Sequence, residues 1–467
     1  MQIINNKLDI KVNHKLKTLG LVIVVSGYIP WAIAETPINQ TKIDMSTAIL
    51  GACVQGPTVN SADFQNRCDA VVGAGGGPDG FISSVTNSAD GQNTDLINSI
   101  NEVAPEQLIV PGVQATRTMK SVTSIANVAV TSRLDTLRAS LNNSTTQLAN
   151  RSQVESGRFV FAASPIPRGG AAGIGDTSRL GIWGNGTFIT GDVDTATNQL
   201  GFDFDNWGGT LGVDYRITND LVTGLAFTYL NTDADVDSSA GNVESDSYTG
   251  SIYATYSHQS GFYVDGIASY GASDFEISRR IQYTLPTDAA PDVVDTTAEG
   301  DPNGSQYSFG MGVGYQFAVG SSTIEPFARA DYQEYEIDSY TESGGQGWGE
   351  RFSRQRIRSL PTSVGLRLSN AFSMPWGVLI PQAHGTWHHE FKDDSRTITT
   401  SFLGDGAAAP NQFSIVTEGP DRDYYTVGAS LNATFVHGIT AFVAYNTLLG
   451  YRDVDSHRVT FGGRLEF

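Results

Sequence analysis

The stretch Val459–Phe467 reads Val-Thr-Phe-Gly-Gly-Arg-Leu-Glu-Phe, and it decides the fold. Its apolar residues alternate with polar ones, which predicts a strand with one apolar face and one polar face. The apolar set is Val459, Phe461, Leu465 and Phe467. A chain that ends on such a strand is typical of outer-membrane barrels, because the last strand must pair with the first and leave no open edge. The alternative is the terminal strand of a soluble β-sandwich.

The composition narrows the class of protein. A chain of 467 residues has room for two or three domains, and its formal net charge of -20 argues against nucleic acid as a partner. No apolar run approaches the ~18 residues that a membrane-spanning helix requires. A membrane location therefore requires a β-barrel, whose partner is the lipid of the outer membrane.

Residues 1–34 have the pattern of a signal peptide. Four lysines precede an apolar core, Leu19–Ile29, which is too short to span a membrane. A small-x-small triplet then predicts cleavage between Ala34 and Glu35. The segment predicts passage through a secretion translocon. The alternative is a short membrane anchor.

The chain contains two cysteines, Cys53 and Cys68. In an oxidising compartment they can form a disulfide, which closes a loop and contributes about 3 kcal/mol. The alternative is a metal site with two ligands. It lacks further partners, since no histidine lies between Glu35 and Ser257. We expect no metal and no cofactor.

Residues 35–112 are predicted to form a short helical segment. One helix is expected over Met45–Val54, a second after the N-cap residue Ser61, and a third over Thr94–Val103. The glycine-rich stretch Gly73–Gly80 lacks the lysine of a phosphate-binding loop, so we interpret it as a linker.

Residues 113–150 are predicted to form one long linker helix. Val113–Leu148 contains neither proline nor glycine, and its apolar residues recur at helical spacing among serine, threonine, asparagine and arginine. Such a helix fits the lumen of a polar pore. The alternative is a coiled-coil or bundle helix. Residues 151–178 follow as a flexible linker.

Residues 179–467 are predicted to form a twelve-stranded antiparallel transmembrane β-barrel, so that the fold class is mainly β. In Tyr307–Phe317, for example, aromatic and aliphatic residues alternate with serine, glycine and glutamine, as in a wall between lipid and a polar lumen. The strand-like segments begin near Arg179, Phe204, Leu221, Asp246, Gly261, Ser305, Thr323, Gln355, Gly377, Tyr424, Gly438 and His457.

The connections between these segments alternate between short and long. Membrane barrels have short periplasmic turns and longer outer loops, so both ends of the barrel are expected on the periplasmic side. The short connections are Thr218–Asp220, His258–Ser260, Ala318–Ser322, Asn370–Pro375 and Val436–His437. The long ones centre on Asp194, Asp237, Asp292, Gly345, Gly406 and Asp453.

This organisation resembles an autotransporter, the type V secretion family. The supporting stretches are Leu180–Gly184, Gly209–Tyr215, Asn101–Gln107, Thr131–Arg138 and Val459–Phe467. The resemblance implies that residues 179–467 form the translocator domain in the outer membrane of a Gram-negative bacterium. It also implies that the barrel-assembly machinery recognises the closing strand, with Phe467 as its terminal mark.

The chain departs from the family in the length of its passenger. Family passengers are usually long β-helices, whereas Glu35–Val113 is short and shows no β-helical repeat. The alternatives left open are a vestigial passenger, a plug and a small adhesive module. Some relatives cleave their linker inside the barrel, and Asn142-Asn143 lies in a suitable region, although adjacent asparagines are common in polar helices.

Catalysis is not expected from this sequence. The passenger has no histidine, so a Ser-His-Asp or Cys-His arrangement cannot be built from it. On one strand, His384 and His388 would lie about 13 Å apart, too far for one metal ion, and His389 would point to the other face. A further set of charged residues is expected to face the lumen, where they would form salt bridges or a polar lining. This set is Arg329, Asp331, Arg356, Arg358 and Arg367.

The favoured function is that of an outer-membrane autotransporter, whose barrel anchors and exports or displays a small passenger. The alternative is a surface adhesin or binding protein, whose acidic outer loops contact a ligand on a host or neighbouring cell. A barrel enzyme such as an outer-membrane protease fits less well, because those barrels have another strand count and no long helix ahead of the barrel.

Overall fold

The computed structural model describes residues 40–86, 94–103, 130, 179–196, 200–285, 291–417, 419–435 and 439–466. The signal peptide with its cleavage site at Ala34 and Glu35 lies outside these ranges. So do the linker helix apart from Val130, the 151–178 linker, Asn142-Asn143 and the terminal Phe467. None of the described helices is long and apolar enough to cross a membrane.

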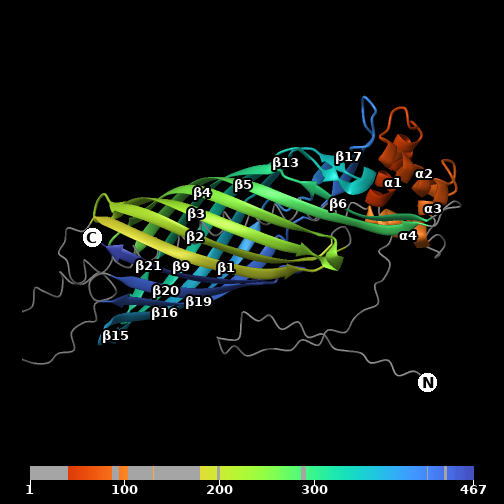
Figure 1. Ribbon diagram of the computed structural model, residues 1–467. Coiled ribbons are helices and arrows are strands. Elements are labelled where there is room, and N and C mark those ends of the chain that lie inside the picture. The colour runs from red at the N-terminus through yellow and green to blue at the C-terminus, as the bar shows by residue number, and fades with distance from the viewer. Residues whose placement is uncertain are drawn as a thin grey trace, which may run out of the picture. The chain divides into compact units, whose positions relative to one another are not determined.

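Within the described residues, twelve antiparallel strands form a closed barrel, which confirms the predicted fold class (Figure 1). Closure comes from β21, which pairs with β1 from Gly181↔Glu466 to Val193↔Val454. The wall consists of β1 (Leu180–Val193), β2 (Phe202–Arg216), β3 (Leu221–Val236), β4 (Gly241–Ser257), β5 (Phe262–Leu285), β7 (Asn303–Tyr315), β9 (Ser322–Ile337), β14 (Pro361–Asn370), β16 (Gly377–Glu390), β19 (Asp423–Phe435), β20 (Thr440–Leu449) and β21 (Val454–Glu466).

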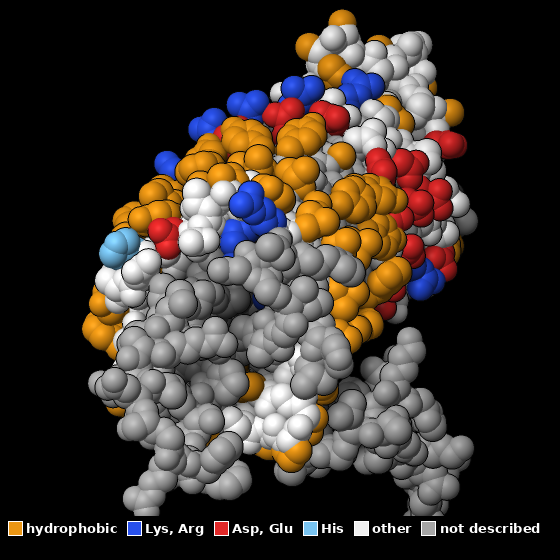
Figure 2. Space-filling view, turned by 90° about the vertical axis from the view of Figure 1, so that its left-hand side faces the viewer, with side chains coloured by type: hydrophobic (Ala, Val, Ile, Leu, Met, Phe, Trp, Pro, Cys, Tyr) orange, Lys and Arg blue, Asp and Glu red, His pale blue; other side chains and the backbone are white. Residues whose placement is uncertain are grey.

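The wall has an apolar outer face and a polar inner face. On β7, Tyr307, Phe309 and Met311 are exposed, whereas Ser308 between them is buried. Because side chains alternate along a strand, the outer face presents hydrophobic residues to lipid. Figure 2 shows hydrophobic side chains gathered on this outer wall. The predicted alternation is thereby confirmed.

The prediction that the connections are short at one end of the barrel and long at the other is only partly right. The connections near Asp292, Gly345 and Gly406 are long and carry strands of their own. Those at Asp237 and Asp453 have only four residues each, between β3 and β4 and between β20 and β21, so their predicted length was wrong. The aspartate-rich ends of β3 and β2 continue as strands: Asp233 pairs with Asp205, and Asp235 pairs with Asp203.

The three long outer connections fold into additional sheet at the outer end. β5 extends beyond the barrel and pairs with β6 (Asp292–Gly300), and β13 (Gln355–Ser359) extends the pairing of β9. A separate four-stranded sheet consists of β10 (Tyr340–Thr341), β12 (Glu350–Phe352), β17 (Thr397–Phe402) and β18 (Gln412–Val416). The remaining short elements are β8 (Phe317–Val319), β11 (Ser343–Gly344), β15 (Phe372–Met374) and the 3₁₀ turns Asp237–Ser239 and Gly345–Gly347.

Within residues 40–103, the described part of the chain contains four short helices: α1 (Gln40–Cys53), α2 (Ala62–Ala74), α3 (Phe81–Thr86) and α4 (Thr94–Glu102). Ser61 caps α2, and its side chain accepts a hydrogen bond from the backbone N–H of Phe64, as the sequence predicts. α3 was not predicted. The Gly73–Gly80 stretch consists of the end of α2 and a hydrogen-bonded turn to α3, not an open linker, because Gly76 and Gly77 have φ of 88° and 80° and allow a tight reversal.

Candidate functional site

The candidate site is the contact between the helices and the outer loops. We call the described residues 40–86 and 94–103 the cap. We call the outer end of β5 together with β6, β10–β13, β17, β18 and the connections between β10 and β12 and between β17 and β18 the platform; these connections include Glu342, the 3₁₀ turn Gly345–Gly347 and Trp348. The ring of Phe64 on α2 lies 5.8 Å from that of Trp348 and 5.4 Å from that of Phe402 on β17, and all three side chains are fully or almost fully buried. Cap and platform therefore share one hydrophobic core.

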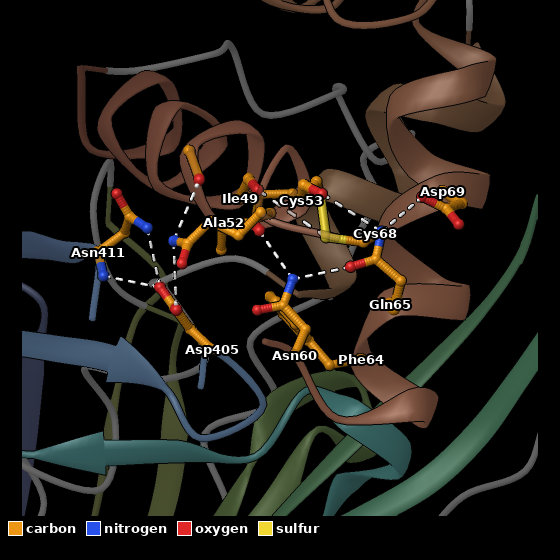
Figure 3. The surroundings of a disulfide bond; sticks show 12 residues. Ile49, Ala52, Cys53, Asn60, Phe64, Gln65, Cys68, Asp69, Asp405 and Asn411 are labelled. Atoms are coloured by element: carbon orange, nitrogen blue, oxygen red, sulfur yellow. Dashed lines mark hydrogen bonds between the residues drawn. A yellow bond between two sulfur atoms is a disulfide. The ribbon is translucent and has the colours of Figure 1, made fainter. Parts of the chain in front are cut away.

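A disulfide and a buried amide pair hold α1 against α2. Cys53 and Cys68 are joined by a disulfide, with Cα atoms 5.4 Å apart. Next to it, Asn60 Nδ2 donates to the carbonyl oxygen of Ala52 at 2.7 Å and to Gln65 Oε1 at 2.8 Å (Figure 3). These bonds fix the angle at which α2 presents Phe64 to the platform.

We expect the double substitution Cys53→Ser and Cys68→Ser to destabilise the cap by about 3 kcal/mol, because the reduced chain regains the entropy of an open loop. The measurement is the rate at which protease cuts the cap in assembled protein. The barrel should keep its heat-modifiable migration in SDS gels. Equal cutting rates in the variant and the unaltered protein would contradict the expectation.

Polar contacts fasten the cap to the β17–β18 loop. The carboxylate of Asp405 accepts hydrogen bonds from Asn411, through its backbone N–H at 2.7 Å and its Nδ2 at 2.9 Å, and from Gln55 Nε2 of the cap at 3.5 Å (Figure 3). The backbone N–H of Ser61 donates to the carbonyl oxygen of Gly404 at 3.0 Å. This outer loop therefore lies against the cap.

The close approach of cap and loop requires two glycines. A Cβ at Gly404 would lie 2.2 Å from Cβ of Phe64, and one at Gly406 would lie 1.8 Å from the carbonyl oxygen of Val59. About one turn further along α2, Arg67 forms an ion pair with Asp292 of β6. The cap is therefore held from two separate outer connections.

A buried charged cluster lies inside the platform. Arg279 on β5 donates from Nη2 to Glu342 Oε2 at 2.6 Å and to the carbonyl oxygen of Trp348 at 3.0 Å. Glu350 lies 3.9 Å from the same Nη2, and its Oε2 accepts a hydrogen bond from Thr400 Oγ1 at 2.7 Å. One guanidinium thus faces two carboxylates in a site where each of these three side chains is at most 1% exposed.

Burial raises the pKa of Glu350 and Glu342 raises it further, while Arg279 acts in the opposite direction. The folded platform therefore holds a proton that the unfolded chain releases at lower pH. We expect the stability of the platform to be fully present below the ordinary carboxyl pKa and to fall as the pH rises through the raised value.

The measurement is thermal unfolding of the cap and platform at about pH 5 and about pH 9, with protease cutting as the signal for unfolding. Glu350→Gln should flatten it, because the amide carries no titrating proton. Equal stability at both pH values in the unaltered protein would contradict the assignment.

Inside the barrel, Val130 is helical and fully buried. It belongs to a cluster with inward-facing side chains of four strands: Trp183, Val222, Ala226, Tyr253 and Ile267. The indole Nε1 of Trp183 donates to the hydroxyl of Tyr253 at 2.8 Å. A residue of the predicted linker helix therefore lies among the side chains of the barrel interior.

The predicted lumenal charges are partly confirmed. Arg329 pairs with Asp331 at 2.6 Å, and Arg367 pairs with Glu325 at 2.6 Å, all with largely buried side chains. The prediction was wrong for Arg356 and Arg358. They lie on β13, beyond the membrane-spanning part of the wall, and both side chains are 53% exposed. Their salt bridges to Glu336 and Glu334 are on the outside of the protein.

The histidines of β16 point to opposite faces, as predicted. His388 Nδ1 lies 2.8 Å from Ser363 Oγ, and its Nε2 lies 3.1 Å from Thr426 Oγ1. His389 faces outward, with its Nδ1 2.8 Å from Asp423 Oδ1.

Phe64, Trp348, Asp405 and Arg279 are not among the functional residues predicted from the sequence. Phe64 is the one aromatic residue of α2 in a segment with few aromatics, which is a weak signal for a docking side chain. Arg279 lies in a run of alternating residues that is longer than a membrane-spanning strand requires. The excess length indicates that the strand extends beyond the lipid.

Comparison with known proteins agrees with this architecture. The family model of the autotransporter β-domain matches residues 182–446, more than half of the chain. Among curated relatives, esterase EstA of Pseudomonas aeruginosa is 24% identical over 213 residues, covering 45% of this chain and 31% of EstA. Outer membrane protein A of Rickettsia conorii is 27% identical over 278 residues, covering 57% of this chain and 13% of that protein. The chain thus spans less than a third of the length of these relatives.

Solved structures with a similar barrel include the translocator domain of NalP from Neisseria meningitidis. It is 17% identical with a TM-score of 0.49, and the match covers 62% of this chain and 90% of that one. The transport unit of AIDA-I from Escherichia coli is 12% identical with a TM-score of 0.42, covering 71% of this chain and 99% of that one. On the extent of the β-domain match, together with the closed twelve-stranded wall, the chain belongs to the autotransporter family of the Gram-negative outer membrane.

Proposed function

We propose that the barrel exports the cap and retains it at the cell surface, docked on the platform made by its own outer loops. The observation that carries this proposal is the shared core of Phe64, Trp348 and Phe402. Burial of such large side chains contributes about 1.5–3 kcal/mol each, so release of the cap would expose them at a substantial cost. Display on the barrel, and not release into the medium, is the function that this contact favours.

The test is protease treatment of intact cells that carry an epitope tag inserted at Gly76, in the turn between α2 and α3. We expect the tag to be lost while the barrel survives. The matched control is the same tag at Asn219, in the exposed turn between β2 and β3 at the opposite end of the barrel. That tag should stay protected until the outer membrane is breached. Protection of the Gly76 tag in intact cells, or its recovery in the medium, would contradict the proposal.

We further propose that the segment 113–150 passes through the barrel lumen and connects the cap to β1. Val130 supports this path, because its side chain is fully buried among inward-facing residues of the wall. The proposed domains are otherwise those expected from the sequence: a signal peptide over residues 1–34 cleaved after Ala34, a cap within residues 35–112, and a flexible linker over 151–178.

The closing strand is the proposed contact for the barrel-assembly machinery. Val459, Phe461 and Leu465 point outward from β21 and are 40–49% exposed, so they present an apolar face at the seam with β1. Phe467, the terminal mark that the family resemblance implies, lies outside the described residues and is part of this proposal.

We also propose that the cap has no enzymatic activity. EstA is named as an esterase, but the part of this chain that matches it covers only 31% of EstA. The passenger of this chain contains no histidine for a catalytic triad. The loop around Gly406 lies against Val59 of the cap, which does not favour the alternative of an adhesin acting through that loop.

A further inference from the structure

The inner face of the barrel becomes more apolar towards its outer end. Midway along the wall, many of the buried inward-facing residues are polar, among them Thr187, Thr210, Thr228 and Thr249, with smaller apolar clusters such as Ile189 and Leu230 between them. At the outer ends of the first five strands they are apolar and at most 8% exposed: Val193, Phe202, Val236, Val243 and Phe275. A water-filled pore is lined by polar residues along its whole length, so an apolar outer end indicates a different use.

These apolar residues are part of a larger core. The same buried cluster continues through Ile398 and Phe402 of β17 to Met45, Ile49 and Phe64 of the cap. One hydrophobic core therefore runs from the outer end of the barrel interior through the platform and into the exported helices. An open mouth would leave this surface in water.

We propose that the docked cap and the platform together close the outer mouth of the barrel, so that the exported segment seals its own exporter. A continuous dry core excludes the hydrated path that ions and small solutes need, as hydrophobic constrictions do in gated channels. The inference rests on the proposed docking of the cap. It gives this short passenger a role that needs no ligand and no catalysis.

The test compares two variants of the full-length chain in planar lipid bilayers. Phe64→Asp places a carboxylate in the shared core, whereas Asn66→Asp places the same side chain on the exposed face of the same helix. Both variants keep the entire linker, so any change in conductance reports on the cap. Heat-modifiable migration in SDS gels shows that each barrel is folded before it is inserted.

We expect Phe64→Asp to produce discrete channel openings, while Asn66→Asp and the unaltered protein stay closed. Phe402→Asp, on the platform side of the same contact, should open the pore in the same way. Closed traces for both core variants in chains that also carry Val130→Asp, which removes the buried contact of the linker in the lumen, would overturn the proposal. Loss of the seal can be told apart from loss of display with the Gly76 tag. If the tag remains accessible on cells while both core variants stay closed, display holds and the seal does not.

Discussion

Replacing Arg279 by Met is expected to destabilise the platform by about 3–5 kcal/mol, because it leaves the carboxylate of Glu342 buried without a cation. In the unaltered protein, the guanidinium bonds Glu342 at 2.6 Å and the carbonyl oxygen of Trp348 at 3.0 Å. The methionine side chain fills similar volume but offers no donor to either group. Because Trp348 carries the contact with Phe64, the cap should become sensitive to protease while the barrel retains its heat-modifiable migration.

The neighbouring residue provides the control. Arg280 points to the opposite face of β5, where its side chain is 41% exposed and pairs with Asp295 at 3.0 Å. An exposed pair contributes less than about 1 kcal/mol, so Arg280→Met should leave the cap resistant. Adding Glu342→Gln to Arg279→Met should restore part of the stability, since it removes the uncompensated charge. Equal protease sensitivity of the two single variants would show that the buried cluster does not hold the platform.

The barrel could be predicted from the sequence because its pattern is local. Each membrane strand alternates between lipid and lumen over about ten residues, as in Tyr307–Phe317, and the structure places β7 and β9 within two residues of the predicted starts at Ser305 and Thr323. Strand pairing between sequence neighbours then follows from the short turns.

The site could not be predicted because its contacts join distant parts of the chain. Arg67 and Asp292 are separated by 225 residues, and no period in the sequence relates them. The aspartate-rich segment around Asp237 was predicted to be a long loop, and this prediction was wrong. Asp233 and Asp235 disfavour a strand by propensity, but pairing with β2 keeps them in one beyond the membrane. Strands that continue beyond the membrane also explain why Arg356 and Arg358 were wrongly predicted to face the lumen. Both residues follow a strand pattern, but their strand lies outside the lipid.

The second large effect is expected from Trp348→Ala, which should destabilise the joint core of cap and platform by about 3–5 kcal/mol. Trp348 is fully buried, and its ring lies 5.8 Å from that of Phe64 and 5.4 Å from that of Phe402. Its Nε1 also donates to the hydroxyl of Tyr283 at 2.9 Å. Truncation therefore leaves a cavity between the two elements and removes the hydrogen-bond donor of a buried hydroxyl.

The measurement is the temperature at which protease begins to cut a tag at Gly76 in assembled protein. Trp376→Ala serves as the matched control, because Trp376 is 39% exposed in the connection between β15 and β16 at the opposite end of the barrel. A shared core predicts that Trp348→Ala exposes the tag at a lower temperature, although the substitution lies more than 200 residues from it in the chain. If the cap instead folded independently of the loops, Trp348→Ala would weaken only the platform and the tag would respond as in Trp376→Ala. The distance between the substituted residue and the tag is what allows this experiment to separate docking from independent folding.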